Sequence, residues 1–235
     1  MNSFISIYAL RITFFTSRFF QLPPMSAYHL PPLYVVTDRH QIGEEHFLQV
    51  LESLISQGGL MLQLRERDLP TRTLLKLAST LSRWAKRDQV PLLINDRVDV
   101  VMATGAQGVH LRGNSLPVQK ARECLGPNRL IGVSVHSADE AVQREREGAD
   151  FVVLGPMYDT PSKRAYGVPL GLSVLEEAHR RCQIPIFAIG GIDPSRVEEI
   201  RKAGAYGIAV ISSIFQSSSP VESVKNYSTQ LGVSP

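Results

Sequence analysis

His136 is the residue in this sequence best suited to move a proton. It directly follows an apolar run that ends at Val135, and Ser134 lies two residues earlier, on the same face of an expected strand. The imidazole pKa lies near neutrality, so the side chain can take up and return a proton at the working pH. His110 also ends an apolar run, where a hydrogen-bonded wall residue is the simpler interpretation. We therefore expect His136 to be the catalytic acid–base group.

Cationic and amide side chains at the ends of other apolar runs predict an anionic ligand. Gln63, Arg65 and Arg67 alternate in sequence, so they share one face of an extended strand. The planar guanidinium of arginine offers phosphate two parallel charge-assisted hydrogen bonds. A surface ion pair between Arg65 and Glu66 is the alternative, which the shared face of 63, 65 and 67 disfavours. The expected substrate-binding residues are Gln63, Arg65, Arg67, Asn95, Ser134, Thr160 and Lys163.

Small residues follow the last two apolar runs and suit a phosphate group. Gly190 and Gly191 let the backbone approach a phosphate oxygen, and Ser212 and Ser213 add hydroxyl donors. A plain tight turn is the alternative explanation for a glycine pair. The expected phosphate-binding residues are Gly190, Gly191, Ile211, Ser212 and Ser213.

The sequence has no pattern typical of a tight transition-metal site. It has no H-x-x-x-H pair, and its two cysteines, Cys124 and Cys182, lie far apart and form no C-x-x-C motif. Neither a zinc ribbon nor a disulfide framework is therefore predicted. We expect no cofactor and a reducing, cytoplasmic setting.

The composition is that of a globular protein. The 235 residues (26.0 kDa) are 43% hydrophobic and 20% charged, with a mean hydropathy of −0.03, which excludes a mostly disordered chain. The formal net charge is +3, whereas nucleic-acid-binding proteins usually carry a larger and more clustered basic excess. We therefore expect no nucleic-acid partner.

Residues 1–30 differ in composition from the remainder of the chain. They include Arg11 and Arg18 and no acidic residue. These arginines interrupt the apolar stretch, so neither a transmembrane span nor a membrane partner is predicted. An amphipathic targeting segment is the alternative to an appendage outside the fold. We expect Met25 to be the working start, and a single catalytic domain to occupy residues 31–235.

Eight short apolar runs alternate with amphipathic segments from residue 33 onward. This order predicts parallel strands joined by helices, and eight such units suit a closed (β/α)8 TIM barrel better than an open sheet. Gly105, Gly148 and Gly204 each stand between a helix end and a strand, where glycine can adopt the left-handed conformation. The expected strands cover 33–37, 60–64, 91–94, 108–111, 130–135, 150–154, 185–189 and 207–211; the expected helices cover 43–57, 70–87, 98–103, 117–125, 138–147, 171–182, 194–203 and 220–231.

Active sites of such barrels lie at the carboxyl ends of the strands, where the polar residues named above are expected to converge. The polar loop over 156–167 has no predicted helix or strand. Long barrel loops are often lids, so we expect this one to become ordered when ligand binds.

The motifs between residues 33 and about 230 resemble those of the thiamine phosphate synthase/TenI superfamily. The matching motifs are Thr37-Asp-Arg39, Gln63-Leu-Arg-Glu-Arg67, Asn95-Asp-Arg97, Gly108-Val-His-Leu111, Ser134-Val-His-Ser137, Gly155-Pro156 with Thr160 and Lys163, Ala188-Ile-Gly-Gly-Ile192, and Gly207-Ile-Ala-Val-Ile-Ser212.

The synthase branch of this superfamily joins a pyrimidine diphosphate to a thiazole phosphate and uses Mg²⁺ held by two aspartates. Asp96 matches the first aspartate, but Ser115 stands where the second is expected. A neutral hydroxyl therefore replaces a hard anionic ligand, and Arg112 adds a cation nearby. The strand motif that usually ends in lysine in synthases ends here in Arg67.

These departures favour the TenI branch, whose members are thiazole tautomerases. The resemblance implies an isomerase that aromatises a carboxylated thiazole phosphate, with His136 moving the proton and no metal required. The first alternative is thiamine phosphate synthase, a transferase that would use Mg²⁺ at Asp96. The second is a non-catalytic regulatory barrel that binds thiazole or thiamine phosphate. The expected partners are a small phosphorylated thiazole and, from the habit of the family, a second copy of the chain.

Overall fold

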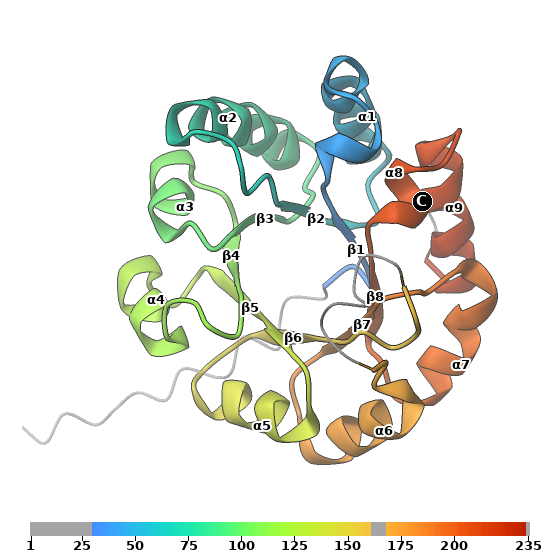
Figure 1. Ribbon diagram of the computed structural model, residues 1–235. Helices are drawn as coiled ribbons and strands as arrows, with labels where there is room; N and C mark the ends of the chain where they lie inside the picture. The colour runs from blue at the N-terminus through green and yellow to red at the C-terminus, as the bar shows by residue number, and fades with distance from the viewer. Residues whose placement is uncertain (1–29, 161–167, 234–235) are drawn as a thin grey trace, which may run out of the picture.

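The computed structural model describes residues 30–160 and 168–233, and these form a closed barrel of eight parallel strands (Figure 1). The strands follow one another in chain order, and β1 closes the barrel by pairing with β8, with Val35 opposite Val210. The (β/α)8 TIM barrel predicted from sequence is thus confirmed. The strands are β1 (Leu33–Val36), β2 (Met61–Leu64), β3 (Leu92–Asn95), β4 (Gly108–Leu111), β5 (Leu130–Val135), β6 (Phe151–Leu154), β7 (Ile186–Ile189) and β8 (Gly207–Val210).

A ring of helices surrounds the strands, as the view down the barrel shows (Figure 1). The expected helix over 194–203 is divided into a short 3-10 turn and α7, and Asp193 caps the turn by accepting a hydrogen bond from the Ser195 amide at 2.9 Å. The sequence did not predict α8, which begins directly after β8. The helical elements are η1 (Arg39–Gln41), α1 (Glu44–Gln57), α2 (Thr71–Arg87), α3 (Val98–Thr104), α4 (Val118–Leu125), α5 (Ala138–Arg146), α6 (Gly171–Arg181), η3 (Pro194–Arg196), α7 (Val197–Lys202), α8 (Ser212–Phe215) and α9 (Pro220–Gln230).

The strands are buried on both faces, which explains why their sequences are apolar without alternation. One face packs against the helices in a large aliphatic layer. The other face fills the barrel interior, where the rings of Tyr34, Phe151 and Phe187 pack edge to face with centroids 5.4–5.9 Å apart. The interior is therefore a solid core rather than a channel, and ligands must bind at one of its ends.

The turns that lead into three strands use glycine as expected. Gly105, Gly148 and Gly204 have φ values of 70°, 94° and 100°, in the region that residues other than glycine rarely adopt. Each allows the chain to leave a helix and turn sharply into the barrel.

Part of the N-terminal extension lies outside the described residues, including Met25 and both of its arginines. Leu30, assigned from sequence to that extension, is 5% exposed and belongs to the barrel interior. No helix among the described residues is long and apolar enough to cross a membrane. Cys124 is exposed, Cys182 is buried, and both are free thiols.

Candidate active site

The carboxyl ends of all eight strands meet at one end of the barrel because the strands are parallel and the barrel is closed. This brings together residues that are far apart in sequence, as expected for a barrel active site. Neighbouring strand ends are joined there by contacts such as Asp96 with Arg112, His110 with Ser134, and His136 with Gly155.

His136 is exposed at the end of β5, where its ring is held by the neighbouring strand. Its Nδ1 lies 2.6 Å from the carbonyl oxygen of Gly155. A carbonyl can only accept, so Nδ1 carries a hydrogen and donates it. In the neutral ring Nε2 is then the atom with a lone pair, facing away from this contact. The backbone amide of His136 donates to Glu140 at 2.7 Å, which ties the residue to α5.

A chain of hydrogen bonds crosses the barrel interior beneath this end. Gln63, expected from sequence to face the barrel mouth, is 3% exposed, and its Nε2 donates to the Tyr34 hydroxyl at 3.1 Å. The Tyr34 hydroxyl lies 3.3 Å from Nδ1 of His110, and Nε2 of His110 lies 2.9 Å from the Ser134 hydroxyl. Gln63 therefore lies deeper than predicted, whereas Ser134 ends the chain at the mouth.

His110 is expected to stay uncharged down to strongly acidic pH. Burial lowers its pKa to about 3, an effect that the nearby Asp96 carboxylate opposes and the Arg65 charge reinforces. In the unfolded chain its pKa returns to about 6.5, so below that pH the unfolded state binds more protons than the native state. As the pH is lowered from 6.5 to 3, the free energy of unfolding should therefore fall by up to about 1.4 kcal/mol per pH unit because of this residue. Imidazole NMR shifts that stay constant from pH 8 to 5 would support this; a midpoint near 6.5 would contradict it.

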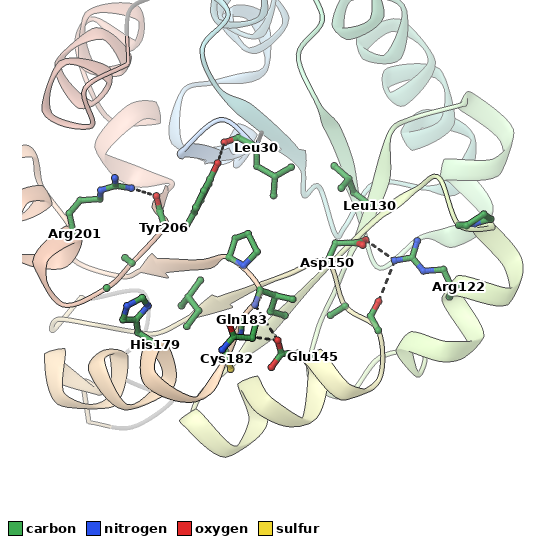
Figure 2. A pocket seen from close by; sticks show the side chains of 18 of the residues that line it. Leu30, Arg122, Leu130, Glu145, Asp150, His179, Cys182, Gln183, Arg201 and Tyr206 are labelled. Carbon is green, nitrogen blue, oxygen red and sulfur yellow. Dashed lines mark hydrogen bonds and ion pairs between the residues drawn. The ribbon is translucent and has the colours of Figure 1, made fainter. Parts of the chain in front are cut away.

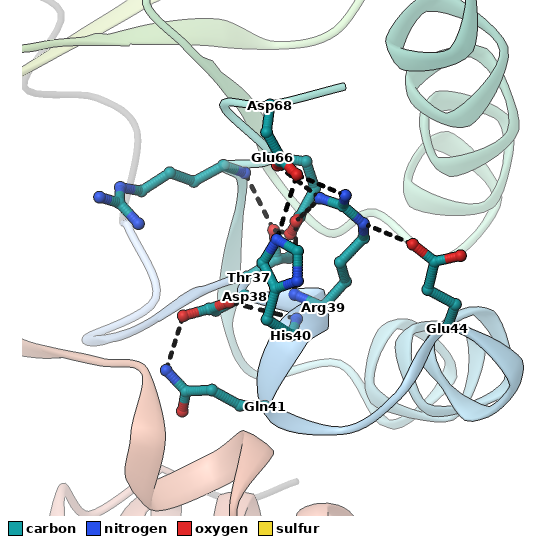
Figure 3. Close-up of polar contacts among 9 residues, drawn as sticks. Thr37, Asp38, Arg39, His40, Gln41, Glu44, Glu66 and Asp68 are labelled. Atoms are coloured by element: carbon teal, nitrogen blue, oxygen red, sulfur yellow. Dashed lines mark hydrogen bonds and ion pairs between the residues drawn. The ribbon is translucent and has the colours of Figure 1, made fainter. Parts of the chain in front are cut away.

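Arg65 and Glu66 do not form a surface ion pair, the alternative that the sequence offers for them. Glu66 is buried, accepts from the Thr37 hydroxyl at 2.6 Å, and pairs with Arg39 at 3.1 Å (Figure 3). The Arg65 amide donates to the Thr37 hydroxyl at 2.9 Å, and its side chain is close enough for its charge to affect His110. Arg67 is exposed. The structure thus brings Arg65 near the mouth.

Arg39 is the centre of a polar cluster that joins the ends of β1 and β2 (Figure 3). Its guanidinium makes two parallel hydrogen bonds of 2.6 Å to Asp68 and a third of 3.1 Å to Glu44. These contacts hold the pKa of Asp68 well below its usual range. The sequence singled out Thr37-Asp-Arg39 as a motif but not its pairing with Glu66 and Asp68, because these residues follow another strand, β2.

Asp96 and Arg112 form an ion pair at the place where the resemblance implies Mg²⁺. The Arg112 amide donates to one Asp96 carboxylate oxygen at 3.0 Å and its Nε to the other. Asp96 itself has a φ of 57°, a conformation that aspartate tolerates better than most residues. Within the described residues, no group of three or more His, Cys, Asp or Glu side chains is arranged to hold a metal ion. With Ser115 as a neutral hydroxyl, these residues do not fit a Mg²⁺ site built by the protein.

The predicted phosphate-binding residues lie on adjacent strands. Gly190 and Gly191 follow β7, Ile211 is the N-cap of α8, and Ser212 is its first residue; Ile189 pairs with Ala209 across the two strands. The amides in the first turn of a helix have no partner within it and suit an anion. The Ser213 hydroxyl contacts Tyr227, so its side chain has a structural partner.

Tyr158 and Arg196 support the glycine turn from outside. Arg196 donates to the Gly191 carbonyl at 2.6 Å, and its guanidinium lies 4.2 Å from the centre of the Tyr158 ring. Burial and the neighbouring Glu199 raise the pKa of Tyr158 to about 12. Thr160 is the last described residue of this segment; Lys163 and most of the expected lid lie outside the described residues.

A hollow of about 1230 Å³ lies at the opposite end of the barrel, before β5 to β8 (Figure 2). The charged side chains in it hold elements together: Arg122 pairs with Asp150 at 2.7 Å, and Glu145 accepts from the Gln183 amide at 2.8 Å. Groups at this end of a barrel usually serve stability. We therefore place the active site at the carboxyl end despite the size of this hollow.

Comparison with known proteins agrees with this architecture. The family model described as thiamine monophosphate synthase matches residues 33–214. A putative thiamine-phosphate synthase of Geobacter sulfurreducens is 48% identical over 190 residues, 81% of this chain and 89% of that protein. A thiamine-phosphate synthase of Roseiflexus castenholzii is 38% identical over 188 residues, covering 80% and 82%.

Among solved structures, a thiamine phosphate pyrophosphorylase from Pyrococcus furiosus superposes with a TM-score of 0.78 and 31% identity, covering 86% of this chain and 96% of that one. The matched residues span the barrel from β1 to α8, including every strand end described above. The chain therefore belongs to the thiamine monophosphate synthase family.

Proposed function

We propose that the protein is a thiamine-phosphate synthase, a transferase that couples a pyrimidine diphosphate to a thiazole phosphate. The observation that carries this proposal is that two groups of hydrogen-bond donors suited to anions lie at the same end of the barrel. One consists of the backbone turns after β7 and β8, around Gly190 and Ser212. The other consists of side chains at the ends of β3 to β5, around Arg112 and Ser134. Two such groups of donors suit two phosphorylated substrates.

The names of the relatives support the synthase better than the tautomerase that the sequence motifs favoured first. Both activities belong to the same superfamily, so the coarser expectation of an enzyme of thiamine biosynthesis is unaffected. The expected homodimer, the cytoplasmic location and the phosphorylated thiazole as substrate stay predictions.

The coupling reaction forms a bond between the thiazole nitrogen and the methylene carbon of the pyrimidine. The bond from that carbon to the diphosphate oxygen breaks, and the diphosphate leaves with the electron pair. Donors fixed before the reaction stabilise the charge that develops on its oxygens. Arg112 and Ser134 are two groups on the β3–β5 side that can supply such hydrogen bonds.

The positive charge of Arg112 balances the negative charge of Asp96 at this site. Asp96 and Arg112 together carry no net charge, as would a divalent cation between two carboxylates. Asp96 takes one side-chain donor of Arg112, out of the five N–H groups of a guanidinium. We therefore expect Arg112 and Ser134 to bind the diphosphate.

Supplying both substrates tests the proposal directly. Hydroxymethylpyrimidine diphosphate and thiazole phosphate are incubated with the protein, with Mg²⁺ and separately with a chelator, and pyrophosphate is measured. We expect steady release of pyrophosphate, equal in amount to the thiamine phosphate formed, in at least one arm. Omission of the thiazole phosphate is the control and should abolish the release. Absence of pyrophosphate in both arms would contradict the proposal.

A thiazole tautomerase is the second candidate, and His136 is the observation that favours it. The contact of Nδ1 with the Gly155 carbonyl leaves Nε2 as the basic atom of the neutral ring. A base of this kind could move a proton between a ring carbon and an exocyclic carbon. In the same assay, conversion of the carboxylated thiazole phosphate tautomer without any pyrophosphate release would favour this candidate.

A further inference from the structure

We propose that Tyr34 and His110 are positioning residues that turn the hydroxyl hydrogen of Ser134 outward, into the barrel mouth. Ser134 then acts as a hydrogen-bond donor of fixed direction toward an anionic oxygen of the ligand. The inference rests on the proposed function only for the nature of that ligand, a phosphate or diphosphate group.

Gln63 sets the direction in which the hydrogen bonds of this chain run. The side-chain nitrogen of Gln63 has only hydrogens to offer, so the Tyr34 hydroxyl oxygen accepts at 3.1 Å. The hydroxyl hydrogen of Tyr34 is then directed to its other neighbour, Nδ1 of His110 at 3.3 Å. Nδ1 therefore accepts and carries no hydrogen of its own.

The second half of the chain passes through the imidazole. His110 is 4% exposed, and no carboxylate among residues 30–160 and 168–233 is hydrogen-bonded to its ring, so the neutral form is the one that fits the barrel interior. A neutral imidazole with an accepting Nδ1 carries its proton on Nε2. Nε2 consequently donates to the Ser134 hydroxyl oxygen at 2.9 Å.

Ser134 is the only member of this chain that reaches the ligand side. It is half-buried at the end of β5, whereas Gln63, Tyr34 and His110 are buried in the interior. Because its oxygen already accepts from His110, its hydrogen is available to point away, toward the mouth. A donor set in this way needs no reorientation when an anion binds, which is the advantage of a preorganised site.

A purely structural role would not need this arrangement. The surrounding interior consists of aromatic and aliphatic side chains such as Phe151, Phe187 and Leu93, and apolar groups would fill the same space without unpaired polar atoms. Burying an amide, a phenol and an imidazole in one connected line is costly unless every group has a partner. The connected line ends at the ligand side, which points to a role in binding.

The tautomer of His110 in the unaltered protein is the first test. Long-range ¹⁵N–¹H NMR distinguishes a ring protonated at Nε2 from one protonated at Nδ1. We expect the Nε2–H form. The Nδ1–H form would mean that the chain runs in the opposite direction and that Ser134 donates inward, which would overturn the proposal. This measurement needs neither a variant nor enzymatic activity.

Binding of inorganic pyrophosphate, measured by calorimetry, is the second test. Ser134→Ala removes the donor, and Tyr34→Phe removes the group that sets its direction; we expect each to weaken binding about 10-fold, the effect of losing a hydrogen bond to a charged group. The double variant should bind no more weakly than Ser134→Ala, because both changes act through the same hydrogen. Additive losses would show that Tyr34 acts only through general stability, and would overturn the proposal.

Tyr206→Phe is the matched control. Tyr206 also packs against Phe187, but its hydroxyl donates to the Leu30 carbonyl at 2.5 Å, away from Ser134. Its loss should leave pyrophosphate affinity unchanged. If the coupling assay fails while these binding effects and the Nε2–H tautomer are found, the synthase proposal falls and this inference stands. If the unaltered protein binds neither pyrophosphate nor phosphate, Ser134 is not an anion donor and the inference falls.

Discussion

A Gly190→Ala variant is expected to lose about 100-fold in pyrophosphate release, the scale on which misplaced binding groups act. Gly190 has a φ of 102°, which alanine adopts only with strain. A Cβ atom there would lie 2.7 Å from the Cβ of Pro156 and 2.8 Å from its Cα. Since Pro156 belongs to the segment after β6, relief of this contact must move the backbone of one of the two loops. The coupling assay measures the loss, and thermal unfolding reports the accompanying strain of about 2 kcal/mol.

Gly105→Ala is the control for backbone strain alone. Gly105 has a φ of 70°, but a Cβ atom there meets nothing within 4 Å, and the turn lies at the opposite end of β4 from the active site. We expect a loss of stability of about 1 kcal/mol and unchanged turnover. Equal activity of the Gly190→Ala and Gly105→Ala variants would contradict a role of Gly190 in phosphate binding.

Replacing Glu66 by Gln is expected to destabilise the barrel by about 3 kcal/mol, near the lower end of the range for breaking a buried ion pair. The Glu66 side chain is 1% exposed and accepts hydrogen bonds from the Thr37 hydroxyl and from Arg39. Glutamine keeps the size but removes the charge, and its amide nitrogen cannot accept either bond. The Arg39 guanidinium, itself only 10% exposed, retains Asp68, which limits the loss. Urea unfolding of the purified protein measures this difference.

Glu44→Gln provides a matched comparison, because Glu44 pairs with the same guanidinium at the same distance of 3.1 Å. Its side chain is 78% exposed, so water replaces the lost contact and we expect a change below about 1 kcal/mol. Similar losses in the two variants would mean that burial of Glu66 contributes little to the stability of the strand ends.

The sequence was sufficient to predict the barrel because its signals are local. Each apolar run is a strand buried on both faces, and glycines such as Gly105 and Gly204 mark the turns through their positive φ values. The short helix α8 was missed because four residues, Ser212–Phe215, are too few to show a helical period. The polar strand ends were recognisable because each directly follows an apolar run.

The depth of a side chain along the barrel could not be predicted in this way. Gln63 and Arg65 share a face of β2, yet Gln63 lies in the interior against Tyr34, whereas Arg65 lies beyond the strand end. Alternation along a strand distinguishes two faces, but interior and mouth belong to the same face of a barrel. Which residue is deep depends on the register with the neighbouring strand, here Val36 opposite Gln63.

By itself, the sequence determined the fold and the family, and it predicted which end of the barrel carries the site. Only the tertiary structure decided which groups are partners: Glu66 with Arg39, Asp96 with Arg112, and His110 with both Tyr34 and Ser134. Each of these pairs joins different strands, so no local spacing can reveal it. Closure of the barrel and the register of its strands bring them within hydrogen-bond distance. Burial keeps the His110 imidazole neutral, whereas the equally buried Glu66 keeps its charge because Arg39 pairs with it.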